Sequence, residues 1–246
     1  MLRKAVAIAE SRGFKLIHGI VDSMWLEKQN ASDAEYKEVC EQIERELGLP
    51  ISFEGRYRWI VFLNSRINPN VPVLNRYYGV FEDGTLKVRG IDLRRHDTPE
   101  IIRKCQTDML AVLSQAKDSE EFNELIPKTL AVVKSYLSAL RLHKVPIEQL
   151  IVEKRLSKTL NEYTNLVPQA IAATHLAREG QDTHAGQTVS YVVTNNESRI
   201  AGNRALPGEF LDESICYDSE WYVDLLLSSV TNLFLPFGYD VKSLRD

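Results

Sequence analysis

The residues best suited to metal chemistry lie near the start of the chain, in the stretch FKLIHGIVDSMWL at residues 14–26. Two runs rich in β-forming residues flank Gly19 and the pair Asp22-Ser23, and this pattern predicts a hairpin with a tight turn. The turn would place the carboxylate of Asp22 at its tip, where it could hold a divalent cation. The alternative is that Asp22 only stabilises the turn through its own backbone, as Asp commonly does.

A second set of residues could bind phosphate, because Arg and Lys neutralise phosphates and Tyr hydroxyls add hydrogen bonds. Tyr77 and Tyr78 are adjacent on an expected strand, so at most one of them can face such a basic surface. The alternative is a solvated face whose arginines pair with nearby acids such as Glu82 and Asp97. The candidate residues for nucleic-acid binding are Arg76, Tyr77, Arg94, Arg95 and, in the basic stretch 152–163, Lys158.

The elements that must position these residues differ between the two halves of the chain. In the first half, alternation, Gly stops and an Asp-Gly turn predict short helices and antiparallel strands. They are a helix over 2–12, the hairpin over 14–26, a helix from the capping box at Ser32 to Gly48, strands within 51–63, a loop at Asn68-Pro69-Asn70, and a hairpin pairing 74–81 with 86–91.

After Asp97 the apolar residues follow a helical period, and Thr98 with Pro99 predicts a helix start. The remaining predicted elements are a helix over 119–143 that Pro127 could break, a turn from Pro146 to Leu150, a helix over 166–179, one strand over 188–193, and a helix from Asp218 through Leu235. The expected fold class is therefore α+β, with a sheet domain over residues 1–97 and a mostly helical domain over 98–246.

Composition limits the class of protein. The 246 residues, of which 44% are hydrophobic and 26% charged, are typical of a globular protein able to bury a substantial core. No apolar run reaches membrane-spanning length, and the N-terminus does not resemble a signal peptide. The three cysteines lack metal-ligand spacing, so a reduced, cytoplasmic setting without a zinc site is expected. A net charge of −4 argues against a wholly basic nucleic-acid binder but not against a local basic patch.

The order of these motifs resembles the C-terminal palm and thumb of a family B DNA polymerase, and most closely the archaeal members. The family's third polymerase motif, Tyr-Gly-Asp-Thr-Asp-Ser, is matched at Gly19, Asp22 and Ser23. Its Lys-Lys-Arg-Tyr motif is matched only at Arg76 and Tyr77, because Leu74 and Asn75 stand where lysines are expected. Its later segments are matched at Gly90-Ile91-Asp92, at Arg94-Arg95-His96-Asp97 and, in the thumb, at Leu156-Ser157-Lys158, Glu162-Tyr163, Tyr191-Val192-Val193 and Phe237-Gly238-Tyr239.

The resemblance implies phosphoryl transfer with two Mg²⁺ ions held by carboxylates. Asp22 would be the catalytic and metal-binding residue of this chain, while the other hairpin aspartate is replaced by Ile20, which cannot ligate a metal. Metal binding should therefore be weakened or incomplete in this chain alone. Primer–template DNA would be the nucleic-acid partner of the Arg, Tyr and Lys residues named above.

No segment resembles the family's earlier aspartate motif, its fingers helix or its exonuclease domain. The chain is therefore expected to act only with a larger polymerase polypeptide, as a small subunit or as a cloned fragment, and to dock through an exposed apolar face on the missing fingers side. The rival hypotheses are a degenerate polymerase remnant that binds DNA or scaffolds a replication or repair complex, and a structural protein without a DNA role. The C-terminal residues lack a sliding-clamp motif, so no clamp contact is predicted.

Overall fold

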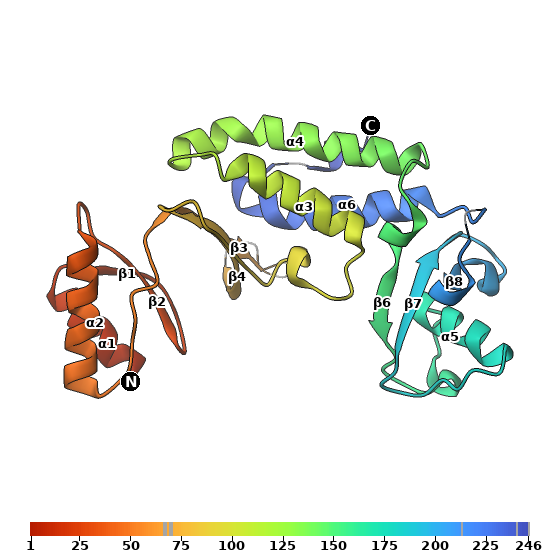
Figure 1. The fold of residues 1–246 in the computed structure, drawn as a ribbon, viewed down its shortest axis with the longest axis horizontal. Coiled ribbons are helices and arrows are strands. Elements are labelled where there is room, and N and C mark those ends of the chain that lie inside the picture. Colours follow the sequence, from red (N-terminus) through yellow and green to blue (C-terminus); the bar gives the residue numbers. More distant parts are fainter. Residues whose placement is uncertain (66–67, 69–70, 213, 240, 246) are drawn as a thin grey trace. The chain divides into compact units, whose positions relative to one another are not determined.

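The structure, a computed structural model, describes residues 1–65, 68, 71–212, 214–239 and 241–245. The predicted loop at Asn68-Pro69-Asn70 therefore lies largely outside the described residues. The chain divides into two compact units, Met1–Arg89 and Gly90–Asp246 (Figure 1). The division falls before the basic loop Asp92–Asp97, which belongs to the second unit, whereas the sequence pattern changes only after that loop. The assignment of these parts to palm and thumb stays a prediction.

The first unit combines two helices with two antiparallel sheets. One sheet is the β1–β2 hairpin, and the other has the strand order β3-β4-β5. The elements are α1 (Leu2–Ser11), β1 (Lys15–Ile20), β2 (Ser23–Glu27), α2 (Asp33–Leu47), β3 (Tyr57–Asn64), β4 (Pro72–Phe81) and β5 (Leu86–Arg89). The strand prediction for residues 51–63 was wrong before Tyr57. Tyr57 pairs with Phe81, after which the neighbouring chain turns at Asp83-Gly84, so residues 51–56 have no strand beside them.

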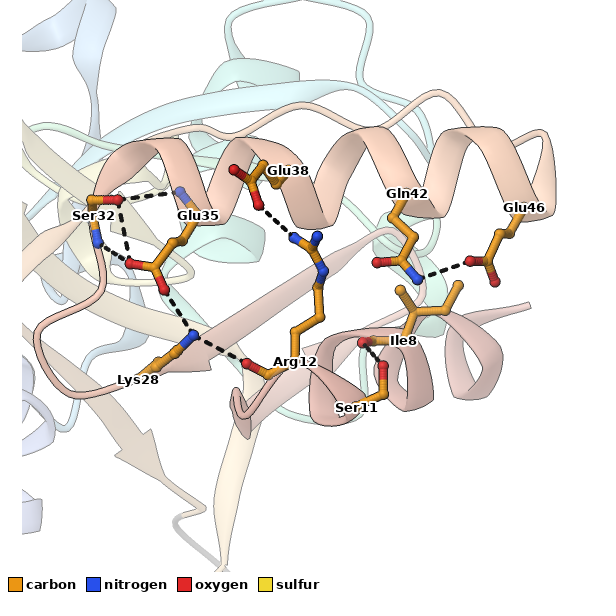
Figure 2. Close-up of polar contacts among 9 residues, drawn as sticks. All are labelled: Ile8, Ser11, Arg12, Lys28, Ser32, Glu35, Glu38, Gln42 and Glu46. Atoms are coloured by element: carbon orange, nitrogen blue, oxygen red, sulfur yellow. Dashed lines mark hydrogen bonds and ion pairs between the residues drawn. The ribbon is translucent and has the colours of Figure 1, made fainter.

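Polar contacts at the start of α2 hold the two helices and the hairpin together (Figure 2). The predicted capping box is confirmed: Ser32 Oγ accepts a hydrogen bond from the Glu35 backbone N–H at 3.3 Å, and the Glu35 carboxylate accepts one from the Ser32 N–H at 2.9 Å. Lys28, just beyond β2, donates to Glu35 Oε1 at 2.8 Å and to the backbone carbonyl of Arg12 at 3.1 Å. Lys28 therefore links the end of the hairpin to the ends of both helices.

The second unit packs three long helices beside a small sheet. Helices α3, α4 and α6 lie against one another, and α5 covers the sheet β6-β7-β8 (Figure 1). The longer elements are α3 (Glu100–Leu113), α4 (Ser119–Arg141), β6 (Val152–Arg155), α5 (Pro168–Arg178), β7 (Thr188–Val193), β8 (Ala205–Pro207) and α6 (Ser219–Phe234). The 3₁₀ turns are η1 (Asp92–Arg94), η2 (Ile147–Leu150), η3 (Leu160–Glu162), η4 (Ala201–Asn203), η5 (Gly208–Phe210), η6 (Leu235–Phe237) and η7 (Val241–Leu244).

Three predictions for the second half need correction. The expectation of a single strand was wrong, because β6 and β8 pair antiparallel with the two sides of β7. The first helix begins at Glu100 with Pro99 as its N-cap, one residue later than the pattern suggested. Pro127 does not break α4, in which it removes one backbone N–H while neighbours such as Phe122 and Ile126 keep the helix packed on the core. The α+β fold class itself is confirmed.

Among the described residues, no helix combines the length and apolar character required to cross a membrane.

Candidate functional site

Asp22 lies at the tip of the β1–β2 hairpin, as predicted. Ile20 pairs with Ser23 across the hairpin, so Val21 and Asp22 form the two-residue turn between the strands. The Asp22 side chain is exposed, and its Oδ1 accepts a hydrogen bond of 3.4 Å from the Ser23 hydroxyl. Val21 is 92% exposed. The carboxylate is thus available to a ligand from outside the hairpin, and its metal role stays a prediction.

The donor set around Asp22 does not amount to a magnesium site. Hard cations such as Mg²⁺ need several oxygen ligands, and a two-metal site needs carboxylates that bridge both ions. Within the described part of the chain, no three His, Cys, Asp or Glu residues are grouped closely enough to hold a metal ion. The half-buried side chain of Ile20 offers no oxygen. Within the described residues, Asp22 at the hairpin tip therefore does not form a metal site with neighbouring His, Cys, Asp or Glu residues.

An aromatic cluster fixes the hairpin against the β3-β4-β5 sheet. The ring of His18 lies 4.4 Å from that of Phe62, and the ring of Trp25 lies 5.7 Å from Phe62 and 5.2 Å from Tyr77, measured between centroids. Beside this cluster runs a groove of about 1050 Å³ that is lined by residues from both sheets and α2, with Asp22 among them. Aromatic side chains such as Tyr36 and Phe53 also line it. The groove gives the first unit an accessible, partly apolar surface near the candidate carboxylate.

The two predicted site residues on β4 differ in accessibility. Tyr77 is 2% exposed, and its ring packs on Trp25 and Phe62, as described above. Tyr78 is buried too, so neither of the adjacent tyrosines presents its ring to solvent. Arg76 is half-buried on the same strand. The arrangement favours a packing role for Tyr77. Its predicted DNA contact would require DNA to reach the hydroxyl past Trp25 and Phe62.

The basic loop Asp92–Asp97 presents two arginines in different ways. Arg95 donates from Nε to Asp97 Oδ1 at 2.9 Å and from Nη2 to Asp97 Oδ2 at 2.8 Å, and its Nη1 lies 3.9 Å from Asp92 Oδ1. Hydrogen bonding from Arg95 lowers the pKa of Asp97 below its ordinary value, and the charge of Lys154 on β6 contributes to the same shift. Arg94 is exposed and forms no ion pair within the described ranges. Arg95 is therefore partly occupied by its own loop, whereas Arg94 is available.

Lys158 lies in a loop that local hydrogen bonds hold in shape. The Tyr163 hydroxyl accepts a hydrogen bond from the Ser157 backbone N–H at 3.0 Å. The Glu162 carboxylate accepts from the Thr159 backbone N–H at 2.9 Å and from its hydroxyl at 2.7 Å. The hydrogen bond from the Thr159 hydroxyl is the main cause of a lowered pKa at Glu162. Lys158 lies between Ser157 and Thr159, the two residues held by these hydrogen bonds, and its side chain is exposed.

The structure brings only some of the predicted site residues into one unit. Arg94, Arg95 and Lys158 belong to the second unit, and Asp22, Arg76 and Tyr77 belong to the first. Sequence reasoning placed Lys154 and Arg155 in the basic stretch 152–163 but named only Lys158 from that stretch as a site residue, and the structure exposes both cations on β6. The charged run Glu153-Lys154-Arg155 is typical of an edge strand, and it could have indicated that these two cations lie on one.

Comparison with known proteins identifies the family. A family model described as DNA polymerase family B matches residues 3–237. The DNA polymerase of Archaeoglobus fulgidus is 26% identical over 260 residues, which cover 99% of this chain and 31% of that protein. The DNA polymerase of Thermococcus kodakarensis is 28% identical over 246 residues, which cover 97% of this chain and 14% of that protein. The chain thus spans less than a third of the length of these relatives.

A solved structure has a similar fold. It is the family B DNA polymerase from the hyperthermophilic archaeon Pyrobaculum calidifontis, with a TM-score of 0.67 and 24% sequence identity over 97% of this chain and 29% of that chain. The resemblance to archaeal family B polymerases that the motif order predicted is confirmed by these matches. Because the family model accounts for nearly all of the sequence, the chain belongs to DNA polymerase family B.

Proposed function

We propose that this chain forms the C-terminal palm and the thumb of a DNA-directed DNA polymerase and binds primer–template duplex. It works with a larger polypeptide region that carries the exonuclease domain, the fingers and the remaining catalytic aspartate. The single observation that carries the proposal is the exposed position of Asp22 at the hairpin tip of a chain that matches family B over residues 3–237. An exposed carboxylate can complete a metal site whose other ligands lie on a second surface.

The duplex grip is assigned to basic side chains in both units of the chain. Arg94 and Lys158 are exposed and make no ion pair in the described part of the chain, so they can neutralise phosphates. Arg95 uses its Nε and Nη2 to bind Asp97, which leaves Nη1 for a phosphate. Arg76, on β4, is the fourth residue assigned to the grip. Tyr77, next to Arg76 on β4, packs on Trp25 and Phe62.

The chemistry that Mg²⁺ supplies in such an enzyme is stabilisation of charge on the attacking and leaving oxygens during phosphoryl transfer. Asp22 would be one ligand of that shared site, and the rest of the site would lie on the larger polypeptide region. No reaction step is assigned to this chain alone, since it offers one carboxylate where two ions need several.

The test is primer extension by the chain assembled with the remaining polymerase regions. Asp22→Ala should reduce the extension rate by about 10²-fold or more while leaving duplex binding intact, as expected when a metal ligand is lost. Asp83→Ala is the matched control, because Asp83 is an acidic turn residue of the same unit whose carboxylate accepts a hydrogen bond from the Thr85 N–H at 2.8 Å. Equal extension by wild type and Asp22→Ala would refute the metal role.

A second candidate function is favoured by Ile20. An apolar residue at this position leaves Asp22 as the carboxylate at the hairpin tip, as expected of a degenerate polymerase that binds DNA or scaffolds a replication or repair complex. An assembled complex that binds duplex DNA with the salt dependence of phosphate contacts, yet extends no primer, would support this candidate over the first.

A further inference from the structure

A buried polar relay connects the basic loop Asp92–Asp97 to the helices behind it. The side chain of Gln106, on α3, is 0% exposed, and its Oε1 accepts a hydrogen bond from the Leu93 backbone N–H at 2.7 Å. Its Nε2 donates to the hydroxyl of Ser229 on α6, also at 2.7 Å. Ser229 is 3% exposed. One amide group thus joins the loop, α3 and α6 through two short hydrogen bonds.

The relay specifies one position of the loop. A buried amide is stable only while its oxygen and nitrogen have partners, and the residues one turn from Gln106 on α3, Ile102, Met109 and Leu110, are apolar and buried. A shift of Leu93 away from α3 would leave the Gln106 oxygen without a donor in a region closed to water. Buried polar networks that are fully satisfied hold one arrangement in preference to others.

Two further contacts complete the fixation of the loop. The side chain of Ile91 is buried at 1% exposure, and its carbonyl accepts a hydrogen bond from the Arg94 backbone N–H at 3.0 Å. On the other side, Asp97 holds the Arg95 guanidinium by two hydrogen bonds. Arg94 follows directly after Leu93, so the relay sets the backbone from which this exposed guanidinium projects.

We infer that Gln106 is a positioning residue for duplex DNA binding: through Leu93 it holds Arg94 where the guanidinium meets a backbone phosphate. The inference rests on the proposed duplex-binding function and deepens it. Gln106 itself touches no DNA in this scheme, and Ser229 acts one step further back by holding the amide in its orientation. The ligand is the phosphate backbone of a duplex, so base sequence should matter little.

The experiment compares Gln106→Met, which removes both polar atoms at similar length, with Arg94→Ala and with the double variant. The full chain is titrated into a fluorescently labelled primer–template duplex, and anisotropy is measured at several salt concentrations. Arg94→Ala should weaken binding about 3–10-fold and reduce the slope of log K against log salt by about 1. Gln106→Met should have most of the same effect, and adding Arg94→Ala to it should cost less than about twofold more.

Thr129→Val is the matched control. Thr129 is a buried polar residue of the same unit whose hydroxyl bonds only within α4, to the Leu125 carbonyl at 2.9 Å. This variant should change folding stability without changing duplex affinity by more than about twofold, which separates a general structural effect from a positioning effect. Circular dichroism verifies that each variant is folded at the temperature of the titration.

Ser229→Ala keeps the hydrogen bond from Leu93 to Gln106 but removes the acceptor of the Gln106 amide nitrogen. This variant replaces Gln106→Met in the experiment if Gln106→Met does not fold. It should weaken duplex binding by an intermediate factor. Wild-type affinity and salt slope in folded Gln106→Met, or full additivity with Arg94→Ala, would overturn the inference while leaving the proposed function standing. Failure of the wild-type chain to bind any duplex would overturn the proposed function itself.

Discussion

Tyr222→Phe removes a single oxygen from the second unit, and we expect it to be strongly destabilising because that oxygen serves two backbone segments. The Tyr222 hydroxyl donates to the Leu150 carbonyl at 2.9 Å and accepts from the Val193 N–H at 3.1 Å. The residue is 0% exposed, and burial raises the pKa of its phenol above the ordinary value, so the donor proton is retained. Val193 ends β7, and Leu150 ends the turn that precedes β6.

The magnitude follows from the two groups that would lose their partner. A buried backbone group left without a hydrogen bond costs about 1–3 kcal/mol, so two such groups predict a loss of about 2–6 kcal/mol. For a domain of this size, 1 kcal/mol corresponds to about 2–4 °C in Tm, and a loss of about 3 kcal/mol therefore lowers Tm by about 6–12 °C. The loss should also loosen the attachment of the β6-β7-β8 sheet to the helices.

Urea denaturation measures the effect as a lower midpoint at an unchanged m-value. Tyr136→Phe is the control: the Tyr136 hydroxyl donates to Asp108 Oδ2 at 2.6 Å, but the site is partly exposed and water can replace the lost group. That variant should cost less than about 1 kcal/mol. Equal midpoint shifts for the two variants would refute the argument that the buried Tyr222 hydroxyl, with its two hydrogen bonds, contributes more to stability than the Tyr136 hydroxyl.

Two further predictions concern the first unit. Gly79→Ala should destabilise it by about 1–3 kcal/mol in urea denaturation, because an added Cβ would lie 2.8 Å from the Trp59 carbonyl oxygen. At Gly19 the nearest atom would be 3.6 Å away, so Gly19→Ala should be tolerated, and an equal effect at both positions would contradict the steric argument. The Lys28 hydrogen bond, with that of the Ser32 N–H, lowers the pKa of Glu35 from 4.5 to about 2. The contribution of the Glu35 carboxylate to folding stability is therefore complete above pH 4.5 and is lost as the pH falls toward 2. The difference in folding stability between wild type and Glu35→Gln should shrink as the pH falls from 4.5 to 2, and it should stay constant above pH 4.5.

Local signals predicted the first unit well. The Ser32 capping box, the Gly48 stop and the Asp83-Gly84 turn each satisfy backbone groups within a few residues, so their outcome depends little on the rest of the fold. The hairpin that carries Asp22 belongs to the same class, since a two-residue turn between β-forming runs determines its own register. Position at the tip, and therefore exposure of the carboxylate, followed from the sequence.

Features that depend on distant partners were not predictable in the same way. Strand β6 has three exposed charged residues and becomes a strand only because Thr188–Val193 offers an edge to pair with. The burial of Tyr77 depends on Trp25, which lies 52 positions earlier in the chain. The relay from Leu93 through Gln106 to Ser229 likewise joins residues that no local pattern connects. Such contacts are set by tertiary packing, which overrides local preference.

Hydration of the Asp22 carboxylate explains why it is stable at the hairpin tip without the other ligands that a metal site needs. An exposed carboxylate at a turn is solvated by water, so Asp22 requires no metal to be stable, whereas a second aspartate at the half-buried position of Ile20 would lose part of its hydration without a cation to compensate. Isoleucine at position 20 avoids this cost, and the His18 ring packs against Trp25 and Phe62. Under the proposed function, the other metal ligands would lie outside the described part of this chain. That proposal requires an active assembly to bring at least one further carboxylate close to Asp22, and it predicts that a complex unable to do so retains duplex binding but not catalysis.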